Sequence, residues 1–421
     1  MPYIKRIIDE DIKNGLAAAG AVAIRGPRAC GKTETALQYA SSDVNLIYDV
    51  AARDLARLAP SSILEGDTPR LIDEWQEAPD VWNAVKTEVD RRRTSGQFIL
   101  TGSSAVNKDN NLHSGAGRFI LHDMSTMTWA ELGYSNATVS LGDLLAGNSI
   151  KPSQNKTELS DILTRLVVGG WPMLMGKTER QAKDINKAYV DLLLSDDISR
   201  VSGIERDRRR ATQIFTSLSR NIATTVGIAT LSNDSESNEV DGDDVTVSRQ
   251  ATYDYLEDLK KLMIVIDQPA WRPHVRSAVR LRTKPKRHLA DPSLAVAALG
   301  ISSKTLIKDL RYTGFLFESQ VFHDLTVYAR ANDAELSYYR DSSDSEVDII
   351  VEDRAGNWAA FEVKLGDDDL DTAAAKLLAF AANIDTNKTK EQGSLNIVTG
   401  VGYGYVRPDG VNVLPLSILG A

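Results

Sequence analysis

The sequence predicts an α/β fold in three parts: a parallel-sheet core at the N-terminus, a helical and winged-helix middle, and a second α/β domain at the C-terminus. The first part is indicated by short apolar runs that alternate with helical segments at 33–40 and 81–93. Strands that alternate with helices in this way form a parallel sheet with helices on both faces. The runs that we expect to be strands are 21–25, 45–49, 70–73, 97–101 and 119–122.

The later pattern of apolar residues predicts the other two parts. Residues 247–262 carry apolar side chains at helical spacing and are followed by a strand-like run at 263–266. Beyond residue 305 the expected elements are a helix at 313–330, strands at 336–340, 346–352 and 358–364, and a helix at 371–382. The three parts correspond to four regions, because the middle part is divided in two. The N-terminal core is 1–135, the middle comprises a linker and helical lid at 136–205 and a winged-helix-like region at 206–300, and the C-terminal domain is 301–421.

The composition is that of an ordinary globular protein. Of 421 residues, 42% are hydrophobic and 25% charged, with a net charge of −9, which excludes a mainly disordered or fibrous chain. No apolar run approaches the roughly 18 residues of a membrane span, and the N-terminal segment does not have the pattern of a signal peptide. The single cysteine excludes an internal disulfide. We therefore expect a cytoplasmic protein with no membrane partner, in which only local patches are basic.

A phosphate-binding motif follows the first expected strand. The segment GPRACGKT at 26–33 fits G-x-x-x-x-G-K-[ST], in which backbone N–H groups surround a phosphate. Lys32 would reach the β- and γ-phosphates, and Thr33 would ligate Mg²⁺. The motif predicts ATP and Mg²⁺ as cofactors, and we expect the side chain of Cys30 to point away from the phosphates. The expected nucleotide-binding residues are Gly26, Pro27, Arg28, Ala29, Cys30, Gly31, Lys32, Thr33 and Glu34.

Polar residues end the third and fourth expected strands. Asp73 is a candidate ligand of Mg²⁺, and Glu74 is a candidate base for the attacking water. An acidic pair in a plain loop is the alternative interpretation. Thr101 or Ser103 can sense the γ-phosphate, as a polar residue does here in P-loop enzymes of the additional-strand type, unless this segment is a plain turn.

Arg118 lies in a glycine-rich segment before the fifth expected strand. An arginine at this place can serve as an arginine finger, either in cis or in trans from a second copy of the chain. A homo-oligomer is therefore one expected assembly. A surface arginine without a catalytic role is the alternative.

A second group of candidate residues lies near the C-terminus. Glu318 is on an expected helix, Asp348 on a strand, and Glu362 and Lys364 two positions apart on the next strand, where alternation places them on one face. Three carboxylates can bind Mg²⁺ or Mn²⁺, and Lys364 can offset charge that develops on a phosphate. This is the layout of a PD-(D/E)xK nuclease site. A solvated ion pair or a catalytically inactive copy are the alternatives.

Positive charge is concentrated in the middle of the chain. Segment 272–287 contains seven Lys or Arg residues and no acid. In a winged helix, Ser248, Arg249 and Gln250 would open the recognition helix, and the basic segment would contact phosphates from the wing. DNA or another nucleic acid is thus an expected partner, although a winged helix is also a packing module in ATPases.

These segments together resemble a family of prokaryotic AAA-type P-loop ATPases that carry a C-terminal domain of unknown function with a PD-(D/E)xK, restriction-endonuclease-like fold. The resemblance covers nearly the whole chain and is carried by GPRACGKT, LIDEWQ, FILTGSS, GAGR, GGWP, KPK with the later Asp291-Pro292, FLFES, EVDII and FEVK. It implies an AAA-type ATPase core at 1–135 and a nuclease-like domain at 301–421. The residues that it matches are Lys32, Thr33, Asp73 and Glu74 in the core and Glu318, Asp348, Glu362 and Lys364 in the nuclease-like domain.

Two functional hypotheses follow from the sequence. In the first, the chain is an enzyme in which ATP hydrolysis is coupled to a nuclease-like module that acts on nucleic acid. In the second, it is an ATP-driven regulatory switch that binds a protein partner, and the nuclease fold is catalytically silent. Complete sets of motif residues at both sites favour the first, and the overall acidity favours the second.

Overall fold

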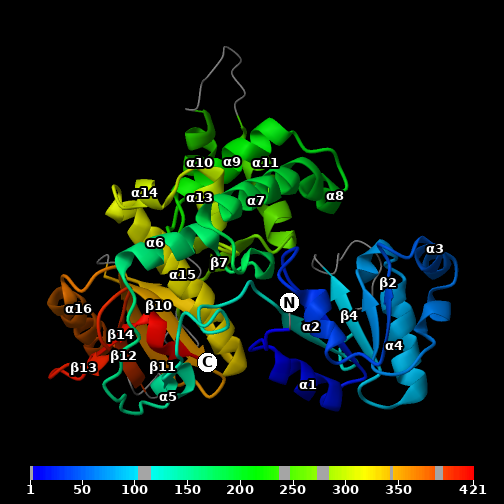
Figure 1. The fold of residues 1–421 in the computed structure, drawn as a ribbon, viewed down its shortest axis with the longest axis horizontal. Coiled ribbons are helices and arrows are strands. Elements are labelled where there is room, and N and C mark those ends of the chain that lie inside the picture. Colours follow the sequence, from blue (N-terminus) through cyan, green and yellow to red (C-terminus); the bar gives the residue numbers. More distant parts are fainter. Residues whose placement is uncertain (1–2, 103–114, 237–246, 273–283, 342–344, 385–391) are drawn as a thin grey trace. The chain divides into compact units, whose positions relative to one another are not determined.

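The computed structural model describes residues 3–102, 115–236, 247–272, 284–341, 345–384 and 392–421. The chain divides into two compact units (Figure 1). Unit 1 comprises Met1–Thr126 with Trp171–Met173 and Lys261–Met263, and unit 2 comprises Met127–Gly170, Leu174–Lys260 and Ile264–Ala421. In the part of the chain that is described, no helix is long and apolar enough to cross a membrane.

Unit 1 is built on a five-stranded parallel sheet with the strand order β2-β3-β4-β1-β5. Its strands are β1 (Ala21–Arg25), β2 (Ser42–Asn45), β3 (Arg70–Asp73), β4 (Phe98–Gly102) and β5 (Phe119–Asp123). Its helices are α1 (Asp9–Ala18), α2 (Lys32–Leu37), α3 (Val50–Leu58) and α4 (Val81–Arg92), with short 3₁₀ turns at Pro60–Leu64 and Trp75–Glu77. The α/β fold with a parallel sheet is confirmed, and β4 lies between β1 and β3.

Alternation along the strands supplies a hydrophobic core on each face of this sheet. Ala21 and Ala23 of β1 face a core with Trp82 and Phe98, which α3 and α4 cover. The intervening Val22 and Ile24 face the opposite core, which α1 and α2 cover (Figure 1). Central strands that are buried on both faces are apolar throughout, which is why these runs were recognisable in the sequence.

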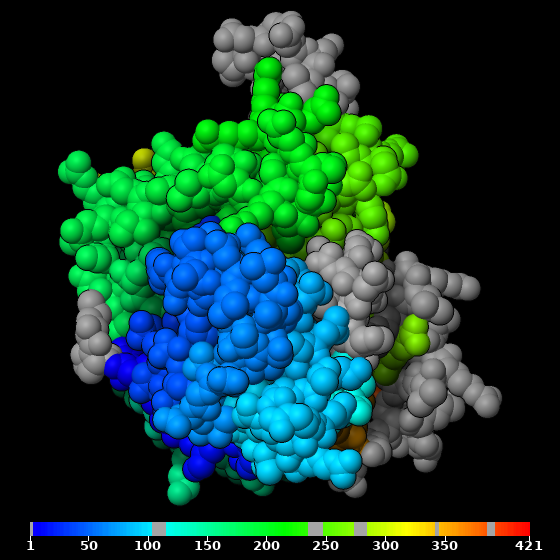
Figure 2. Space-filling view, turned by 90° about the vertical axis from the view of Figure 1, so that its right-hand side faces the viewer, coloured from blue at the N-terminus to red at the C-terminus, as the bar shows by residue number. Residues whose placement is uncertain are grey.

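The second expected strand, 45–49, is wrong in its position. The strand β2 ends at Asn45, and a turn follows. The side-chain Oδ1 of Asn45 accepts hydrogen bonds from the backbone N–H groups of Ile47 and Tyr48, both at 2.9 Å. An asparagine that bonds to the backbone ahead of it starts a turn and ends a strand. The next helix, α3, keeps much of its apolar surface in solvent where it faces the viewer in Figure 2, and Leu58 is 86% exposed.

The first part of unit 2 is mostly helical. Its helices are α5 (Leu141–Leu145), α6 (Leu159–Val168), α7 (Glu179–Leu192), α8 (Ile198–Ser202), α9 (Arg208–Arg220), α10 (Ile228–Glu236), α11 (Arg249–Lys261), α13 (Ser293–Ala298) and α14 (Ser303–Leu306). A π turn lies at Leu193–Asp197. A 3₁₀ turn at Pro172–Leu174 begins in a segment of unit 1 and ends in unit 2. An antiparallel hairpin of β7 (Val265–Gln268) and β8 (Lys286–Leu289) follows α11. The expected strand at 263–266 is therefore shifted by two residues.

The C-terminal part of unit 2 is a mixed six-stranded sheet with the order β13-β14-β12-β11-β10-β9. Strands β9 (Ala334–Arg340), β10 (Glu346–Asp353) and β11 (Trp358–Lys364) are antiparallel, and β12 (Gln392–Thr399) runs parallel to β11. The remaining strands are β6 (Val139–Ser140), β13 (Tyr405–Val406), β14 (Asn412–Pro415) and β15 (Leu419–Gly420), with a 3₁₀ turn at Leu416–Ile418. The long helices α15 (Leu310–Ala331) and α16 (Leu370–Ala382) contact the sheet, and Trp358 and Phe380 lie in the core beneath α16.

The β7–β8 hairpin is attached to the edge of this sheet. After β7, Trp271 donates its backbone N–H to the carbonyl of Tyr338 on β9 at 2.6 Å, and Tyr338 donates back to Pro269 at 2.9 Å. The side-chain amide of Gln268 donates to the backbone carbonyls of Ser337 and Asp348. The middle region therefore covers the open edge of β9, where unpaired backbone groups would otherwise need other partners.

Gly170, in the GGWP segment, has a structural role inside unit 2. The backbone N–H of Gly170 donates to Asp291 Oδ2 at 2.8 Å, and its carbonyl accepts from Met127 at 2.7 Å. A Cβ atom on Gly170 would lie 2.2 Å from the carbonyl oxygen of Met127. The glycine is required because two backbone segments approach each other too closely for a side chain. Asp291 also accepts from the N–H of Ser293 at 3.0 Å, which ties this contact to the start of α13.

Candidate functional site

The carboxyl ends of the parallel strands in unit 1 place the predicted nucleotide-binding residues at one edge of the sheet. The loop at 26–31 leaves the end of β1, and α2 begins at Lys32. Backbone pairing sets Asn45 of β2 opposite Asp73 of β3, and Asp73 opposite Thr101 of β4. Crevices at this edge are where open α/β sheets bind ligands.

The loop wraps around the ammonium group of Lys32. The Nζ atom donates to the carbonyl oxygens of Gly26 and Pro27, both at 3.0 Å, and the side chain is 5% exposed. The loop reverses through Ala29 and Gly31, whose φ angles are +62° and +106°. These conformations are typical of loops that turn their N–H groups toward an anion.

Asp73 is the centre of the polar contacts at this edge. The hydroxyl of Thr33 donates to its two carboxylate oxygens at 2.9 and 3.0 Å, and Asn45 Nδ2 donates to Oδ2 at 2.6 Å. Thr101 donates its hydroxyl to Oδ1. A buried carboxylate beside a hydroxyl provides the oxygen ligands that Mg²⁺ takes when it also binds phosphates. The residues present at this site therefore fit a Mg²⁺ ion, with Thr33 and Asp73 to hold it.

Glu74 follows Asp73 in a left-handed conformation, with φ 58° and ψ 46°, which turns its side chain out of the path of the strand. Gln76 donates its amide to the Glu74 carboxylate. Burial raises the pKa of Glu74, and the nearby Lys32 and the Gln76 hydrogen bond oppose this increase. A general base works best when its pKa lies near the working pH, and a raised pKa brings a carboxylate closer to that value.

Two contacts that position the loop were not predicted from the sequence. The guanidinium of Arg6 donates to the carbonyl of Cys30 at 3.0 Å and to the carbonyl of Ser125 at 2.9 Å. Arg6 is almost fully buried. The thiol of Cys30 points into the core and lies 3.7 Å from the carbonyl of Met124, away from the loop interior as expected. Nothing local in the N-terminal sequence distinguishes Arg6 from a surface arginine. Asn45 was also missed, because it was placed in a longer strand.

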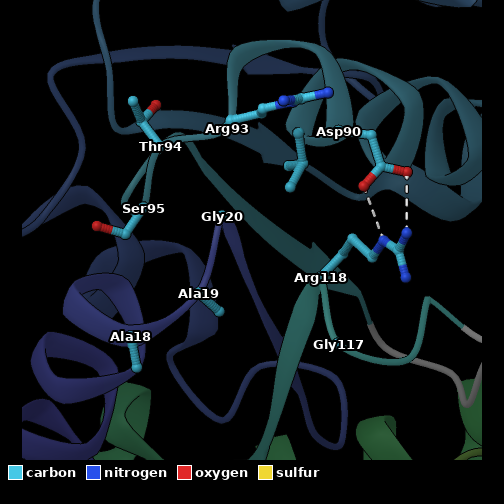
Figure 3. Close-up of a pocket in the computed structure, with 10 residues that line it drawn as sticks. Ala18, Ala19, Gly20, Asp90, Arg93, Thr94, Ser95, Gly117 and Arg118 are labelled. Carbon is cyan, nitrogen blue, oxygen red and sulfur yellow. Dashed lines mark hydrogen bonds and ion pairs between the residues drawn. The ribbon is translucent and has the colours of Figure 1, made fainter.

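Arg118 lies at the opposite edge of the sheet from the loop. Its carbonyl accepts from the backbone N–H of Ala21 at the start of β1, whereas the loop leaves the end of that strand. Five residues of strand separate the two edges by roughly 16 Å. The guanidinium binds the Asp90 carboxylate at 2.8 Å, beside an open cavity of about 570 Å³ that Gly20 and Arg93 also line (Figure 3). Within one chain this position favours the trans version of the arginine-finger hypothesis over the cis version, and the role of Arg118 remains a prediction. Ser103 lies outside the described residues.

In unit 2, the fold brings the predicted acidic residues together, but a lysine lies among them. Glu318 comes from α15 and Asp348 from β10, and the ammonium of Lys286 on β8 lies 2.8 Å from Glu318 and 3.4 Å from Asp348. The same ammonium is 2.7 Å from Glu346. The side chain of Lys286 is only 3% exposed. We refer to Glu318, Glu346 and Asp348 as the acidic cluster.

Glu362 is bound by two other lysines. Lys376 of α16 approaches its carboxylate oxygens at 2.8 and 3.0 Å, and Lys364 approaches one of them at 3.3 Å. The second oxygen of Asp348 accepts from the backbone N–H of Val363 at 2.9 Å. Each predicted carboxylate ligand therefore already has a cationic or N–H partner within the chain.

The charges in this region shift several pKa values. Burial, together with the charge of Asp348, raises the pKa of Glu318 to about 8. Burial and Asp348 likewise raise the pKa of Glu362 to about 7. For Asp348, burial would raise the pKa, but the charges of Lys286, Lys376 and Lys364 and the Val363 hydrogen bond lower it overall.

The acidic cluster does not fit the divalent metal that the nuclease resemblance implies. Lys286 Nζ occupies the position between Glu318 and Asp348 where a shared cation would lie. Among the residues that the structure describes, no group of three or more His, Cys, Asp or Glu side chains is arranged to hold a metal ion. The metal-ligand roles predicted for Glu318, Asp348 and Glu362 are therefore unsupported. The cation beside Glu318 and Asp348 is Lys286, and the cations beside Glu362 are Lys376 and Lys364.

The basic segment differs from its expected role in the residues that can be described. Lys286 and Arg287 are buried, and Arg287 lies 3.5 Å from Asp267. These two side chains cannot contact phosphates on a wing. The basic residues Arg276, Arg280 and Arg282 lie outside the described residues. Exposed side chains do open α11, at Ser248, Arg249 and Gln250.

Comparison with known proteins gives three matches along the chain. Residues 18–133 match a family described as an AAA domain, which implies ATP binding and hydrolysis. Residues 159–305 match a domain of unknown function (DUF8612), and residues 313–419 match another (DUF4143). The chain therefore combines an AAA domain with two domains whose families carry no assigned activity.

The proteins similar to the chain include two mycobacterial relatives and one solved structure. The uncharacterized proteins Rv2008c of Mycobacterium tuberculosis and Mb2031c of Mycobacterium bovis are each 23% identical over 359 residues, covering 84% of this chain and 72% of theirs. A structure of the Aeropyrum pernix ORC1 protein in complex with DNA matches 72% of this chain and 93% of its own, at 13% identity and a TM-score of 0.24. The chain is thus distantly similar to the two mycobacterial proteins over most of its length, and its residues 18–133 match an AAA domain.

Proposed function

We propose that the chain is a Mg²⁺-dependent ATPase whose nucleotide site is the loop Gly26–Thr33 at the edge of the sheet in unit 1. The observation that carries this proposal is the contact of the Thr33 hydroxyl with both carboxylate oxygens of Asp73. These two side chains are the ones that hold Mg²⁺ in P-loop enzymes, and they come from segments 40 residues apart. A chance glycine-rich turn would not bring a strand-end carboxylate to the first turn of the following helix.

Each residue at the edge has a separate part in hydrolysis. Backbone N–H groups of the loop bind the phosphates, and Lys32 exchanges its contacts with Gly26 and Pro27 for contacts with phosphate oxygens. Bound Mg²⁺ would offset negative charge on the phosphates. Glu74 accepts a proton from the attacking water, and Thr101 lies on the strand between β1 and β3, where it can sense the γ-phosphate.

The lysine contacts in unit 2 favour the version of the function in which the nuclease-like fold is silent. A nuclease of this type uses its carboxylates to bind a metal that activates water. Here the ammonium of Lys286 lies against Glu318 and Asp348, and that of Lys376 lies against Glu362. We therefore place the activity of the chain in the ATPase unit, with unit 2 as the part that responds to nucleotide and binds a partner.

Two kinds of partner remain part of the proposal. The exposed start of α11 is the described surface that would meet a nucleic acid in a winged helix. A protein partner is the alternative for a regulatory switch. A second copy of the chain is required if Arg118 acts in trans, because within one chain it lies at the far edge of the sheet.

The experiment that tests the ATPase is a comparison of three full-length proteins. Wild-type protein should bind ATP and release phosphate only with Mg²⁺. Lys32→Ala should lose both properties, because it removes the cation that meets the β- and γ-phosphates. Lys13→Ala, which changes an exposed lysine of α1, is the matched control and should behave as wild type. Unchanged ATP binding in Lys32→Ala would exclude this loop as the nucleotide site.

A further inference from the structure

The cation that lies in the acidic cluster comes from a different segment of unit 2 than the carboxylates do. Lys286 is the first residue of β8, in the hairpin of the middle region, whereas Glu318 and Asp348 belong to the C-terminal helix and sheet. Its ammonium has three carboxylate oxygens within 3.4 Å. A lysine ammonium has three N–H donors, so these contacts use its full capacity.

The position of this lysine is fixed by contacts on both sides of it. Two residues before it, the carbonyl of Lys284 accepts from the hydroxyl of Tyr338 on β9, and the Lys286 ammonium lies 5.7 Å from the centre of the Tyr338 ring. Two residues after it, His288 contacts Ser319 of α15 at 3.2 Å and stacks on Phe322. A side chain held in this way cannot swing out of the cluster unless the hairpin separates from the sheet.

Removing water from these charges is costly, and the contacts must compensate for it. A buried ammonium or carboxylate without a partner is strongly unfavourable, and a carboxylate cluster without a cation is further destabilised by repulsion. The ammonium of Lys286 gives the buried carboxylates a partner and reduces the repulsion between them, and the carboxylates in turn give the ammonium its partners. A divalent ion at the same place could do the same for the carboxylates only if Lys286 were absent, since the two cations would repel each other at this distance.

We infer that Lys286 is the resident cation of the acidic cluster, so that the cluster binds the hairpin of the middle region instead of a divalent metal. The cluster thus acts as a permanent ionic attachment between the two parts of unit 2. It follows that removal of the Lys286 charge, and not a change in the carboxylates, converts the cluster into a metal site. The inference does not depend on ATP hydrolysis and is tested without nucleotide.

The test compares Mn²⁺ binding by full-length wild type, Lys286→Met and Lys260→Met, counted by electron paramagnetic resonance in nucleotide-free buffer. Lys260 is the matched control, because it also pairs with two carboxylates but is partly exposed. Wild type and Lys260→Met should show no binding that depends on Asp348. Lys286→Met should gain one site, which the double variant Lys286→Met with Asp348→Asn loses again.

Thermal unfolding provides the second measurement. With Mn²⁺ at about one hundred times the dissociation constant, the Tm of Lys286→Met should rise by about 5–10 °C, while the Tm of wild type should not change. If Lys286→Met folds only when Mn²⁺ is present, the inference is supported as well. A Mn²⁺ site in wild type that Asp348→Asn abolishes would overturn it, and so would a folded Lys286→Met protein that binds no Mn²⁺. If every Lys286→Met preparation is unfolded, the comparison of Mn²⁺ binding by wild type and Asp348→Asn still tests whether the acidic cluster of the wild-type protein binds a divalent metal.

Discussion

Thr33 and Asp73 are joined by a bifurcated hydrogen bond, in which one hydroxyl lies 2.9 and 3.0 Å from the two oxygens of one carboxylate. The hydroxyl lies in the first turn of α2 and the carboxylate at the end of β3. Parallel strand polarity is what brings them to the same edge. Both side chains are natural oxygen ligands of Mg²⁺, so this contact links the fold of unit 1 to its chemistry.

Thr33→Val should weaken Mg²⁺-dependent ATP binding. The substitution keeps the shape of the side chain but removes the oxygen, and a hydrogen bond or ligand bond to a charged group contributes about 1.5–3 kcal/mol, or roughly tenfold to a hundredfold in affinity. The measurement is ATP affinity with Mg²⁺ and with EDTA. Thr87→Val, at an exposed threonine of α4, is the control. Equal stimulation by Mg²⁺ in wild type and Thr33→Val would exclude Thr33 as a ligand.

Arg118→Ala should lower ATP turnover while leaving ATP binding intact, if the arginine reaches the nucleotide of a second copy. An arginine finger contributes about 10³–10⁵ in rate. Mixing inactive Arg118→Ala with inactive Lys32→Ala should restore part of the activity, because mixed assemblies contain an intact site between two chains. Arg93→Ala changes an exposed arginine that lines the same cavity and serves as the control.

The trans role of Arg118 also predicts that specific activity falls on dilution. An Arg118→Ala protein with full activity, together with a specific activity that stays constant at every concentration, would show that its contact with Asp90 is only structural.

The stability of unit 2 should fall as the pH rises from about 4.5 to about 8, and this contribution should level off above that range. Burial holds the pKa of Glu318 at about 8, above its ordinary value of 4.5, so the folded state keeps a proton that the unfolded state releases. The contribution of such a group is fully present below the ordinary pKa and is lost as the pH rises through the folded pKa. Glu318→Gln keeps the side chain neutral, so its urea midpoint should change less with pH.

The control for this pH series is Glu335→Gln, at an exposed residue of β9. It should show the same pH dependence as wild type. Because Glu362, with its pKa raised to about 7, contributes in the same direction, Glu318→Gln should reduce the slope without abolishing it. A slope identical to that of wild type would mean that Glu318 is ionised in the folded protein throughout this range.

Gly170→Ala should destabilise unit 2 by about 1–3 kcal/mol, because the added methyl group forces two packed backbone segments apart. Its Cβ would lie 2.2 Å from the carbonyl oxygen of Met127. Gly314→Ala is the contrasting variant: this helical glycine has no heavy atom within 4 Å of the added Cβ, so alanine should stabilise by about 0.5–1 kcal/mol. The check is urea unfolding of both variants. A Gly170→Ala protein as stable as wild type would remove the structural role assigned to Gly170.

Local sequence patterns were sufficient for four of the five strands in the sheet of unit 1 and for its loop. Strands buried on both faces are apolar throughout, and Lys32 and Thr33 follow a motif that is contiguous in the chain. Asn45 was missed because its side-chain bonds to the following backbone end the strand, and hydropathy does not report such bonds.

The acidic cluster could be predicted only in part, because its cation comes from a distant segment. Glu318 and Asp348 stand out as acids on apolar elements. Lys286 belongs to the run KRHL, which is charged in sequence but buried as a strand, and its partners are 32 and 62 residues away. A basic run is ordinarily a solvated face, and only the tertiary fold turns this lysine inward.

The measurement that tests the central claim most directly is ATP binding and turnover by Glu74→Gln, measured with Mg²⁺ on the full-length protein beside wild type. This substitution keeps the size of the side chain and its place next to Asp73, and it removes the negative charge and the ability to accept a proton. The variant should bind ATP with wild-type affinity and hydrolyse it roughly 10²–10⁴-fold more slowly. Hydrolysis at the wild-type rate by Glu74→Gln would contradict the assignment of the catalytic base and of this sheet edge as the site of hydrolysis.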